Sequence, residues 1–133
     1  MNLLQNLRIK RQAATDKDGS PAYVWIPAAL AAAAYEEIEI ARQFHTAAKY
    51  QPLDWLEIEN LETTNAVTLS INGGVEVWRA APGAVRHIRN KALWSLRVTN
   101  VGAAITTVGN VRITIMREAV GVDEAVRRSV VYA

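Results

Sequence analysis

The sequence predicts an all-β fold, an antiparallel β-sandwich of the jelly-roll kind, from three observations. Short runs in which apolar and polar residues alternate recur from Asp54 onward. Asparagine, glycine and proline separate these runs at spacings of about 8–15 residues, which is typical of a sandwich or barrel. No longer helical pattern lies between the runs, which disfavours parallel strands joined by crossover helices.

The first 50 residues predict a hairpin and then an ambiguous segment. A strand ending near Ala14, a turn at residues 16–19 and a second strand over 23–26 make the N-terminal hairpin. Residues 27–34 are nearly all alanine, the best helix former, so we expect either a short helix or a compact loop there. Isoleucines alternate with glutamates after it and favour a strand over 35–42, although helical spacing also continues through this segment.

The middle of the chain predicts a strand near 54–60 and then a hairpin. The run 67–71 and the run 75–78 flank Asn72-Gly73-Gly74. Asparagine and glycine adopt the positive φ angles that tight hairpin turns require. The turn residues therefore indicate that these two strands pair with each other.

The last strands follow in the same way. Pro82-Gly83 marks a turn before a short strand around Val85 and Ile88. Another strand, over 95–99, breaks at residues 100–102. The last one, over 111–116, places Val111 and its alternate neighbours on one face.

The length of 133 residues predicts one domain spanning 1–133, large enough to bury a single core. Residues 1–20 and 119–133 are candidate arms. The second of these carries five valines, including Val126 and Val130, beside two arginines. We expect it to pack on its own domain or to reach a neighbouring subunit as an extended C-terminal arm.

The net charge of +2 conceals two blocks of opposite sign. Residues 36–62 hold seven acidic and two basic residues, a net of −5, whereas residues 63–133 hold nine basic and four acidic residues, a net of +5. Such blocks pair within one molecule or across a subunit contact. The candidate assembly contacts are Glu36, Glu37, Glu39, Arg86, Arg89, Arg97, Arg112, Val126 and Val130.

Few catalytic chemistries fit this composition. The chain has no cysteine, which excludes disulfides, thiolate metal sites and thiol catalysis. His45 and His87 form no motif with an acid or a nucleophile, and Glu57 with Glu59 is typical of a solvated strand face. No phosphate-binding glycine motif occurs. We therefore expect no catalytic residue, no metal and no cofactor.

The stretch from Trp55 to Glu118 resembles small β-sandwich structural proteins of virus particles, such as phage or thermophile-virus minor capsid and decoration proteins. The residues that carry the resemblance are LEIENLETTNAVTLSINGG (56–74), APGAVRHI (81–88) and LWSLRVTNVGAAITTVGNVRITIMRE (93–118). They include a strand of the form Leu-x-Val-x-Asn-x-Gly, from Leu96 to Gly102. The resemblance implies a jelly-roll subunit without catalytic residues that binds copies of itself and other virion proteins, and a virion location after synthesis in the host cytoplasm.

A non-enzymatic structural protein of a virus particle is thus the expected function. The alternative is a ligand-binding sandwich for glycans or single-stranded nucleic acid, in which exposed tryptophans and the arginines near Trp78 and Trp94 bind the ligand. A membrane location is not expected. The longest uncharged stretch, residues 21–35, holds two prolines and is shorter than the roughly 20 residues that span a bilayer.

Overall fold

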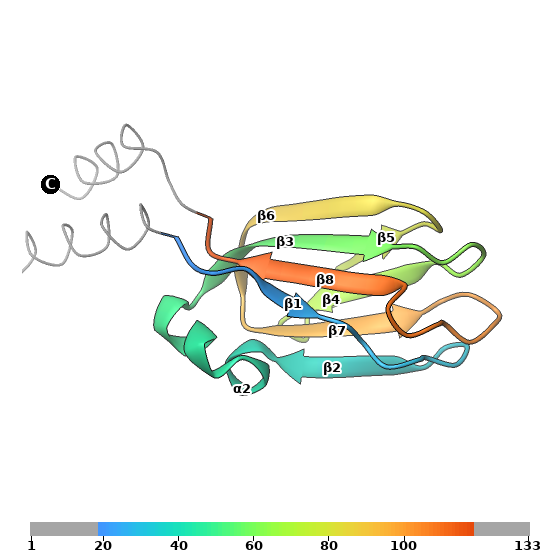
Figure 1. Cartoon of the computed structure of the whole chain (residues 1–133), viewed down its shortest axis with the longest axis horizontal. Helices are drawn as coiled ribbons and strands as arrows, with labels where there is room; N and C mark the ends of the chain where they lie inside the picture. The colour runs from blue at the N-terminus through green and yellow to red at the C-terminus, as the bar shows by residue number, and fades with distance from the viewer. Residues whose placement is uncertain (1–18, 119–133) are drawn as a thin grey trace, which may run out of the picture.

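The computed structural model describes residues 19–118, which form two four-stranded antiparallel sheets packed face to face (Figure 1). The strands are β1 (Tyr23–Trp25), β2 (Tyr35–Glu39), β3 (Leu53–Asn60), β4 (Val67–Ile71), β5 (Val77–Ala80), β6 (Val85–Leu93), β7 (Ser95–Asn100) and β8 (Val111–Met116). Between β2 and β3 lie a short helix, α2 (Ile40–Gln43), and a 3-10 helix, η1 (His45–Tyr50). The predicted all-β jelly-roll sandwich is confirmed.

The strand pairing is that of one long hairpin rolled up on itself. Going inward from the two ends, β1 pairs with β8, β2 with β7, β3 with β6 and β4 with β5. The further pairs β3–β8 and β4–β7 close the sheets in the orders β1-β8-β3-β6 and β2-β7-β4-β5. Because each sheet is open, β1 and β6 form the edges of the first sheet, and β2 and β5 those of the second.

The core lies between the sheets and follows directly from the alternating pattern. Successive side chains of a strand point to opposite faces, so one face of each amphipathic strand is covered by the other sheet. In β8 the side chains of Val111, Ile113 and Ile115 are buried while Arg112 points outward. The largest fully buried apolar side chains are Ile40, Leu53, Leu56, Ile58, Leu69, Leu93, Leu96, Ile113, Ile115, Val67 and Val98.

The alanine-rich segment is a loop, and the helix alternative for it is wrong. Its backbone groups bond across the sandwich instead of four residues back along the chain. Leu30 donates its N–H to Thr106 Oγ1 at 2.8 Å, and Ala33 donates its N–H to the Asn100 carbonyl at 2.9 Å. Ala33 has φ +64°, which a right-handed helix excludes. Tertiary hydrogen bonds therefore override the helix propensity of alanine.

Three strands differ in length from the prediction. The strand predicted over 35–42 ends at Glu39, where α2 begins. The strand predicted from residue 75 begins at Val77, because the hairpin loop spans residues 72–76 and leaves Val75 fully exposed. The β6 strand is longer than the short strand predicted, and its register against β3 shifts between residues 89 and 93, where Asn90 has φ +59°.

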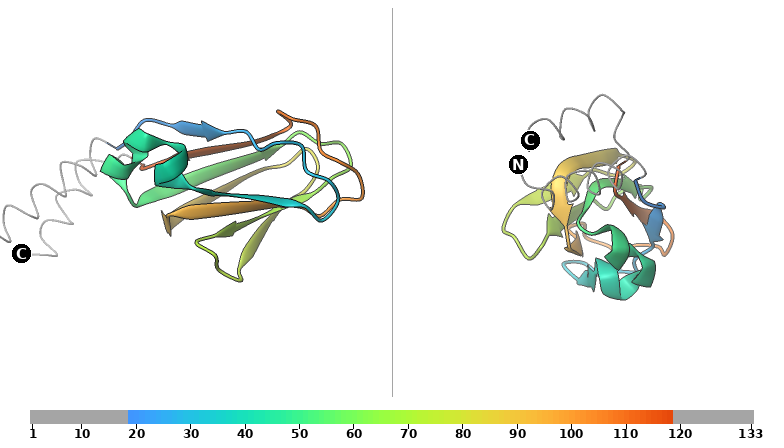
Figure 2. Two further views of the ribbon diagram at one scale, coloured as in Figure 1. Left: turned by 90° about the horizontal axis from the view of Figure 1, so that it is seen from below. Right: turned by 90° about the vertical axis from the view of Figure 1, so that its left-hand side faces the viewer.

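Both ends of the described chain lie at one end of the sandwich, together with α2 and η1 (Figure 2). Ser20 donates its N–H to the Arg117 carbonyl at 3.0 Å, which fixes the entry and the exit side by side. The predicted arms fall mainly on residues 1–18 and 119–133, which lie outside the described residues, as do the first strand of the predicted N-terminal hairpin, Val126 and Val130. The second strand of that hairpin is β1, which pairs with β8.

Candidate assembly surfaces

Three of the seven acidic residues of the acidic block lie on one edge strand. Glu36, Glu37 and Glu39 all belong to β2, whose other side pairs with β7. Glu36 accepts a hydrogen bond from the Ala28 N–H at 2.9 Å, and Glu39 lies 3.5 Å from Arg42. These partners leave lone pairs of each carboxylate free, since an ionised carboxylate has about four acceptor sites. The β2 edge is therefore an acidic surface that still accepts donors.

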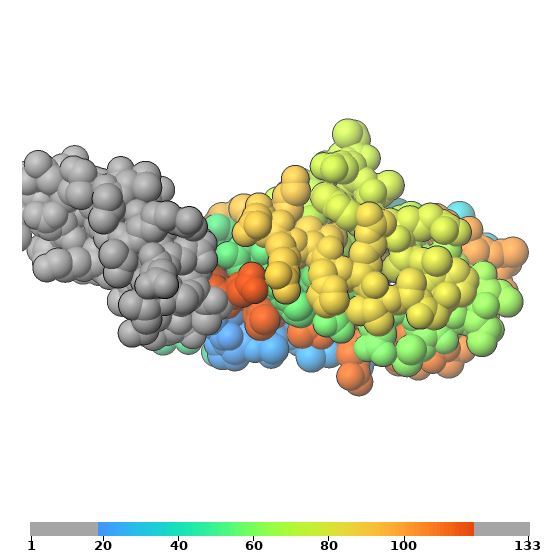
Figure 3. Space-filling view, turned by 90° about the horizontal axis from the view of Figure 1, so that it is seen from above, coloured from blue at the N-terminus to red at the C-terminus, as the bar shows by residue number. Residues whose placement is uncertain are grey.

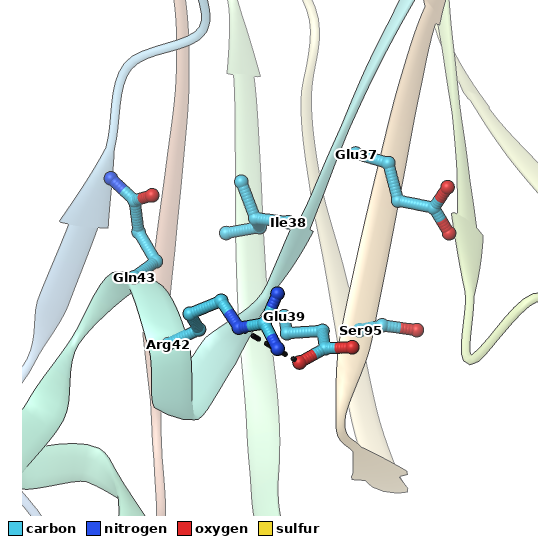
Figure 4. A pocket seen from close by; sticks show the side chains of 6 residues that line it. All are labelled: Glu37, Ile38, Glu39, Arg42, Gln43 and Ser95. Atoms are coloured by element: carbon cyan, nitrogen blue, oxygen red, sulfur yellow. Dashed lines mark ion pairs between the residues drawn. The ribbon is translucent and has the colours of Figure 1, made fainter.

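A pocket of about 470 Å³ opens along this edge (Figure 4). Its walls are Glu37, Ile38, Glu39, Arg42, Gln43 and Ser95, from β2, α2 and the start of β7. Its lining holds one apolar side chain, Ile38, and the carboxylates of Glu37 and Glu39, the second of which pairs with Arg42. A long basic side chain is complementary to such a recess, because its stem is apolar and its end is cationic.

The basic residues gather on the opposite side of the molecule. β2 and β6 lie at opposite sides in Figure 1, and Figure 3 shows the β6 side, with the β4–β5 hairpin projecting beside β6. Arg86 and Arg89 lie on β6, Arg79 lies on the neighbouring edge strand β5, and Lys91 lies in the β6 bulge. All four are exposed and have no ion-pair partner among residues 19–118.

The contacts that these basic side chains do make hold them at the edge. Arg86 donates from Nη1 to the Arg79 carbonyl at 2.8 Å and thus reaches from one sheet to the other. Lys91 Nζ lies 6.0 Å from the centre of the Trp78 ring, a cation–π distance. Because each head group keeps unused donors, the side formed by β5 and β6 is a basic surface.

Arg97 and Glu37, both predicted contacts, are paired with each other within the molecule. Arg97 lies on β7, opposite Glu37 of β2, and its Nη2 donates to Glu37 Oε2 at 3.0 Å. Its guanidinium also lies 4.3 Å from the centre of the Tyr35 ring. The hydrogen bond to Glu37 and the charge of that carboxylate raise the pKa of Arg97. One acidic residue and one basic residue of the two charge blocks therefore pair within the molecule.

Arg112 points outward from the centre of the first sheet. It stands opposite Glu59 of β3, and no ion pair joins it to another of residues 19–118. It is thus brought together neither with the β2 glutamates nor with the basic residues of β6.

His87 does pair with an acid, contrary to the sequence-based expectation. Register places His87 of β6 opposite Glu57 of β3, and His87 Nε2 lies 3.1 Å from Glu57 Oε2. Its ring also packs beside Trp55, with ring centres 5.5 Å apart. Glu57 is half-buried, and Glu59 shares its outward face as predicted. Thirty residues separate His87 from Glu57, so only the strand register reveals the pair.

A buried polar cluster, which the sequence pattern did not indicate, ties the loops together at the other end of the sandwich. Asn60 and Asn100 are fully buried at the ends of β3 and β7. Each accepts an N–H two residues ahead, from Glu62 at 3.0 Å and from Gly102 at 2.9 Å. Their amide groups donate to backbone carbonyls of other loops: Asn60 Nδ2 to Asn65, Ala80 and Ala81, and Asn100 Nδ2 to Leu30 and Ala104.

Glu62 is the charged member of this cluster and is 6% exposed. Its carboxylate accepts hydrogen bonds from Asn65 Nδ2 at 2.9 Å, from the Thr107 N–H at 3.3 Å and from Asn110 Nδ2. Burial alone raises the pKa of Glu62, but the hydrogen bonds from Asn65, Asn110 and Thr107 outweigh it, so the pKa lies below its ordinary value. The signal in the sequence for this cluster is an asparagine at the end of a strand, two residues before Glu62 in one loop and two residues before Gly102 in the other.

The tryptophans are dispersed and do not form one binding face. Trp25 is 3% exposed and Trp55 is 9% exposed, so both serve the packed structure. Trp78 packs against the core and lines a second pocket of about 450 Å³ beside Lys91, while Trp94 is exposed at the β6–β7 turn. Trp78 and Trp94 are thus the tryptophans left for the ligand-binding alternative.

Within residues 19–118, no group of three or more histidine, aspartate or glutamate side chains converges to hold a metal ion. The helices of this part of the chain are all too short or too polar to cross a membrane.

No protein-family model matches the sequence, and neither does any curated protein. Among solved structures the chain is similar to the cupin domain of Schizosaccharomyces pombe Cnp3, at 14% sequence identity and a TM-score of 0.38. The alignment covers 84% of this chain and 59% of that domain. A likeness at this level supports no inference about function.

Proposed function

We propose that the protein is a non-enzymatic structural subunit of a virus particle that assembles side by side with copies of itself. The observation that carries the proposal is the placement of opposite charges on opposite sides of one sandwich. The acidic β2 edge and the basic β5–β6 side make a heterologous pair of surfaces, which generates rings or extended arrays.

Charge also determines which edges pair. Two β2 edges brought together oppose six glutamates, and like charges at close range are repulsive. An acidic edge against a basic one is attractive and places a basic side chain at the pocket between Glu37 and Glu39. The charges thus favour head-to-tail contact and protect the open edge strands against pairing with their own kind.

The assignment to a virus particle is supported by the resemblance of residues 55–118 to virion β-sandwich proteins and by the fold. Eight-stranded jelly rolls are widespread in viral capsids, and also in lectins and cupins. Other copies of the chain and other virion proteins are the proposed partners, and the proposed location is the virion.

Light scattering coupled to size-exclusion chromatography tests the self-assembly of the full chain. We expect masses well above 14.6 kDa at low salt, falling as ionic strength rises, because salt screens exposed charges. Arg79→Glu with Arg89→Glu should abolish the side-by-side assembly. A chain that stays monomeric at low salt and does not bind purified capsids of a virus encoding it contradicts the proposal.

Ligand binding is the alternative that the same basic side serves, since Lys91 lies over the Trp78 ring. Titration with single-stranded oligonucleotides and with oligosaccharides, followed by tryptophan fluorescence, separates the two functions. A saturable response that Trp78→Ala removes, in a chain that remains monomeric, favours the binding function over assembly.

A further inference from the structure

The four loops at the end of the sandwich opposite the helices are almost free of charge. They are residues 26–34, 61–66, 81–84 and 101–110, drawn at the right of Figure 1. Among all their side chains Glu62 is the one ionisable group, and it is buried. The rest are mainly alanine and other small or aliphatic residues, with exposed threonines at positions 63, 64 and 107, in a chain that is 21% charged as a whole.

Aliphatic side chains project from this end into solvent. Leu61 is 55% exposed, Val101 50%, Ile105 64% and Val108 62%. Backbone hydrogen bonds place their loops together: Leu61 donates to the Asn110 carbonyl, and Val101 donates to the Ala66 carbonyl. Several exposed aliphatic side chains on neighbouring loops that lack charge indicate an interaction site, whereas single exposed aliphatics are ordinary. We call these four residues with the four loops the apolar end.

The apolar end is also preorganised. The buried Asn60, Glu62, Asn65 and Asn100 side chains bond to all four loops, so the loops are held without regular secondary structure. Gly102 packs so closely on Asn65 that a Cβ there would lie 2.7 Å from Asn65 Cα. A surface already ordered in the free protein loses little conformational entropy on binding.

We infer that the apolar end is a second contact surface, which binds the apolar end of another copy of this chain. In such a two-fold contact both copies use the same surface, so a surface of one charge sign would oppose its own charge. This end has no exposed charge to oppose, and its small alanines allow close approach of the two backbones. The contact is independent of the side-by-side one, because it uses the end of the sandwich and not its edges.

A lipid surface fits this end less well than a second copy does. Loops that dock on membranes combine apolar residues with lysine or arginine for anionic headgroups and with tryptophan or tyrosine at the interface. The four loops contain none of these residues. Self-contact through aliphatic side chains needs neither.

Salt separates this contact from the side-by-side one. At 1 M NaCl the Debye length is about 3 Å, so contacts between exposed charges are screened while apolar contacts persist. The full chain should then have twice its 14.6 kDa mass by light scattering. Ile105→Glu with Val108→Glu should halve that mass. Val24→Glu, on an exposed valine of β1, is the matched control and should leave the dimer intact.

The absence of cysteine provides a second readout that does not depend on a charge substitution. Under mild oxidation, Ile105→Cys or Val108→Cys should give disulfide-linked dimers in 1 M NaCl, and Val24→Cys should not. A monomeric chain in 1 M NaCl, or cross-linking equal to that of Val24→Cys, overturns the inference. The inference is also overturned if the chain floats with phosphatidylcholine vesicles and the double variant Ile105→Glu with Val108→Glu does not. That result would assign the apolar end to a membrane. Loss of low-salt assembly in Arg79→Glu with Arg89→Glu bears on the edges alone.

Discussion

Glu37 and Arg97 lie 3.0 Å apart on the outward face of the second sheet, where β2 pairs with β7. This ion pair joins the acidic block of the chain to the basic block within one molecule. It shows that Arg97 is paired inside the molecule, whereas Arg79, Arg86 and Arg89 form no ion pair among residues 19–118.

Removing the internally paired guanidinium should therefore leave assembly nearly unchanged. In Arg97→Gln we expect the mass distribution of the wild type at low salt, because Arg97 is already satisfied by Glu37 and packs over Tyr35. Light scattering of this variant beside Arg89→Gln is the measurement. Equal loss of assembly in both variants would mean that Arg97 also contacts the neighbouring subunit.

The strand pattern was predictable because alternation of apolar and polar residues directly reports burial on one face. β7 and β8 agree closely with the prediction, as does the turn at Asn72. The loop over 27–34 was ambiguous, because its conformation depends on hydrogen bonds to residues 100–106, far away in the sequence. No local propensity carries that information.

The surfaces were predictable only in part, for the same reason. The acidic and basic composition is local and was visible in the sequence, as was the strand that places three glutamates on one edge. Which arginine meets which glutamate depends on register, so neither the Glu37–Arg97 pair nor the Glu57–His87 pair could be foreseen. Burial of Glu62 contradicts the usual exposure of glutamate and follows from its neighbours in the fold.

Stability should fall in acid because of Glu62. Its pKa in the folded protein lies below the ordinary value of 4.5, so the stabilisation is complete well above pH 4.5 and is lost as pH falls through the lowered pKa. Urea unfolding between pH 7 and pH 3 should show this decline. Glu62→Gln should be less stable than the wild type at pH 7, by about 1–3 kcal/mol, because its amide opposes the donors of Asn65 and Asn110. If the stability of Glu62→Gln falls between pH 7 and pH 3 as much as that of the wild type, other carboxylates cause the decline.

Asn60→Asp should destabilise the fold strongly. The Asn60 amide donates to the carbonyls of Asn65, Ala80 and Ala81, and an aspartate places a charged acceptor against all three. A buried unpaired charge costs roughly 3 kcal/mol or more. Chemical unfolding measures the loss, and Asn90→Asp, at an exposed bulge, is the control that should change little. Equal stability of the two variants would contradict the burial of Asn60.

Gly102→Ala should also be destabilising, for a steric reason. The new methyl group would lie 2.7 Å from Asn65 Cα, and backbone at that distance cannot move aside without disturbing the loop cluster. Forced overpacking costs about 1–3 kcal/mol. Gly83→Ala, where nothing lies within 4 Å but φ is +77°, isolates the smaller cost of backbone conformation. The close packing of Gly102 on Asn65 is contradicted if Gly102→Ala lowers the melting temperature less than Gly83→Ala does.

The central claim, head-to-tail contact between the β2 edge and the β5–β6 side, is tested most directly by mixing two variants. Glu37→Lys with Glu39→Lys makes both sides basic, and Arg79→Glu with Arg89→Glu makes both sides acidic. Each variant alone should form nothing larger than the dimer that the apolar end allows, by light scattering at low salt. An equimolar mixture should regain assemblies in which the two variants alternate, because every contact again joins an acid surface to a basic one. A mixture that forms nothing larger than either variant alone, or either variant assembling alone as the wild type does, would contradict the account.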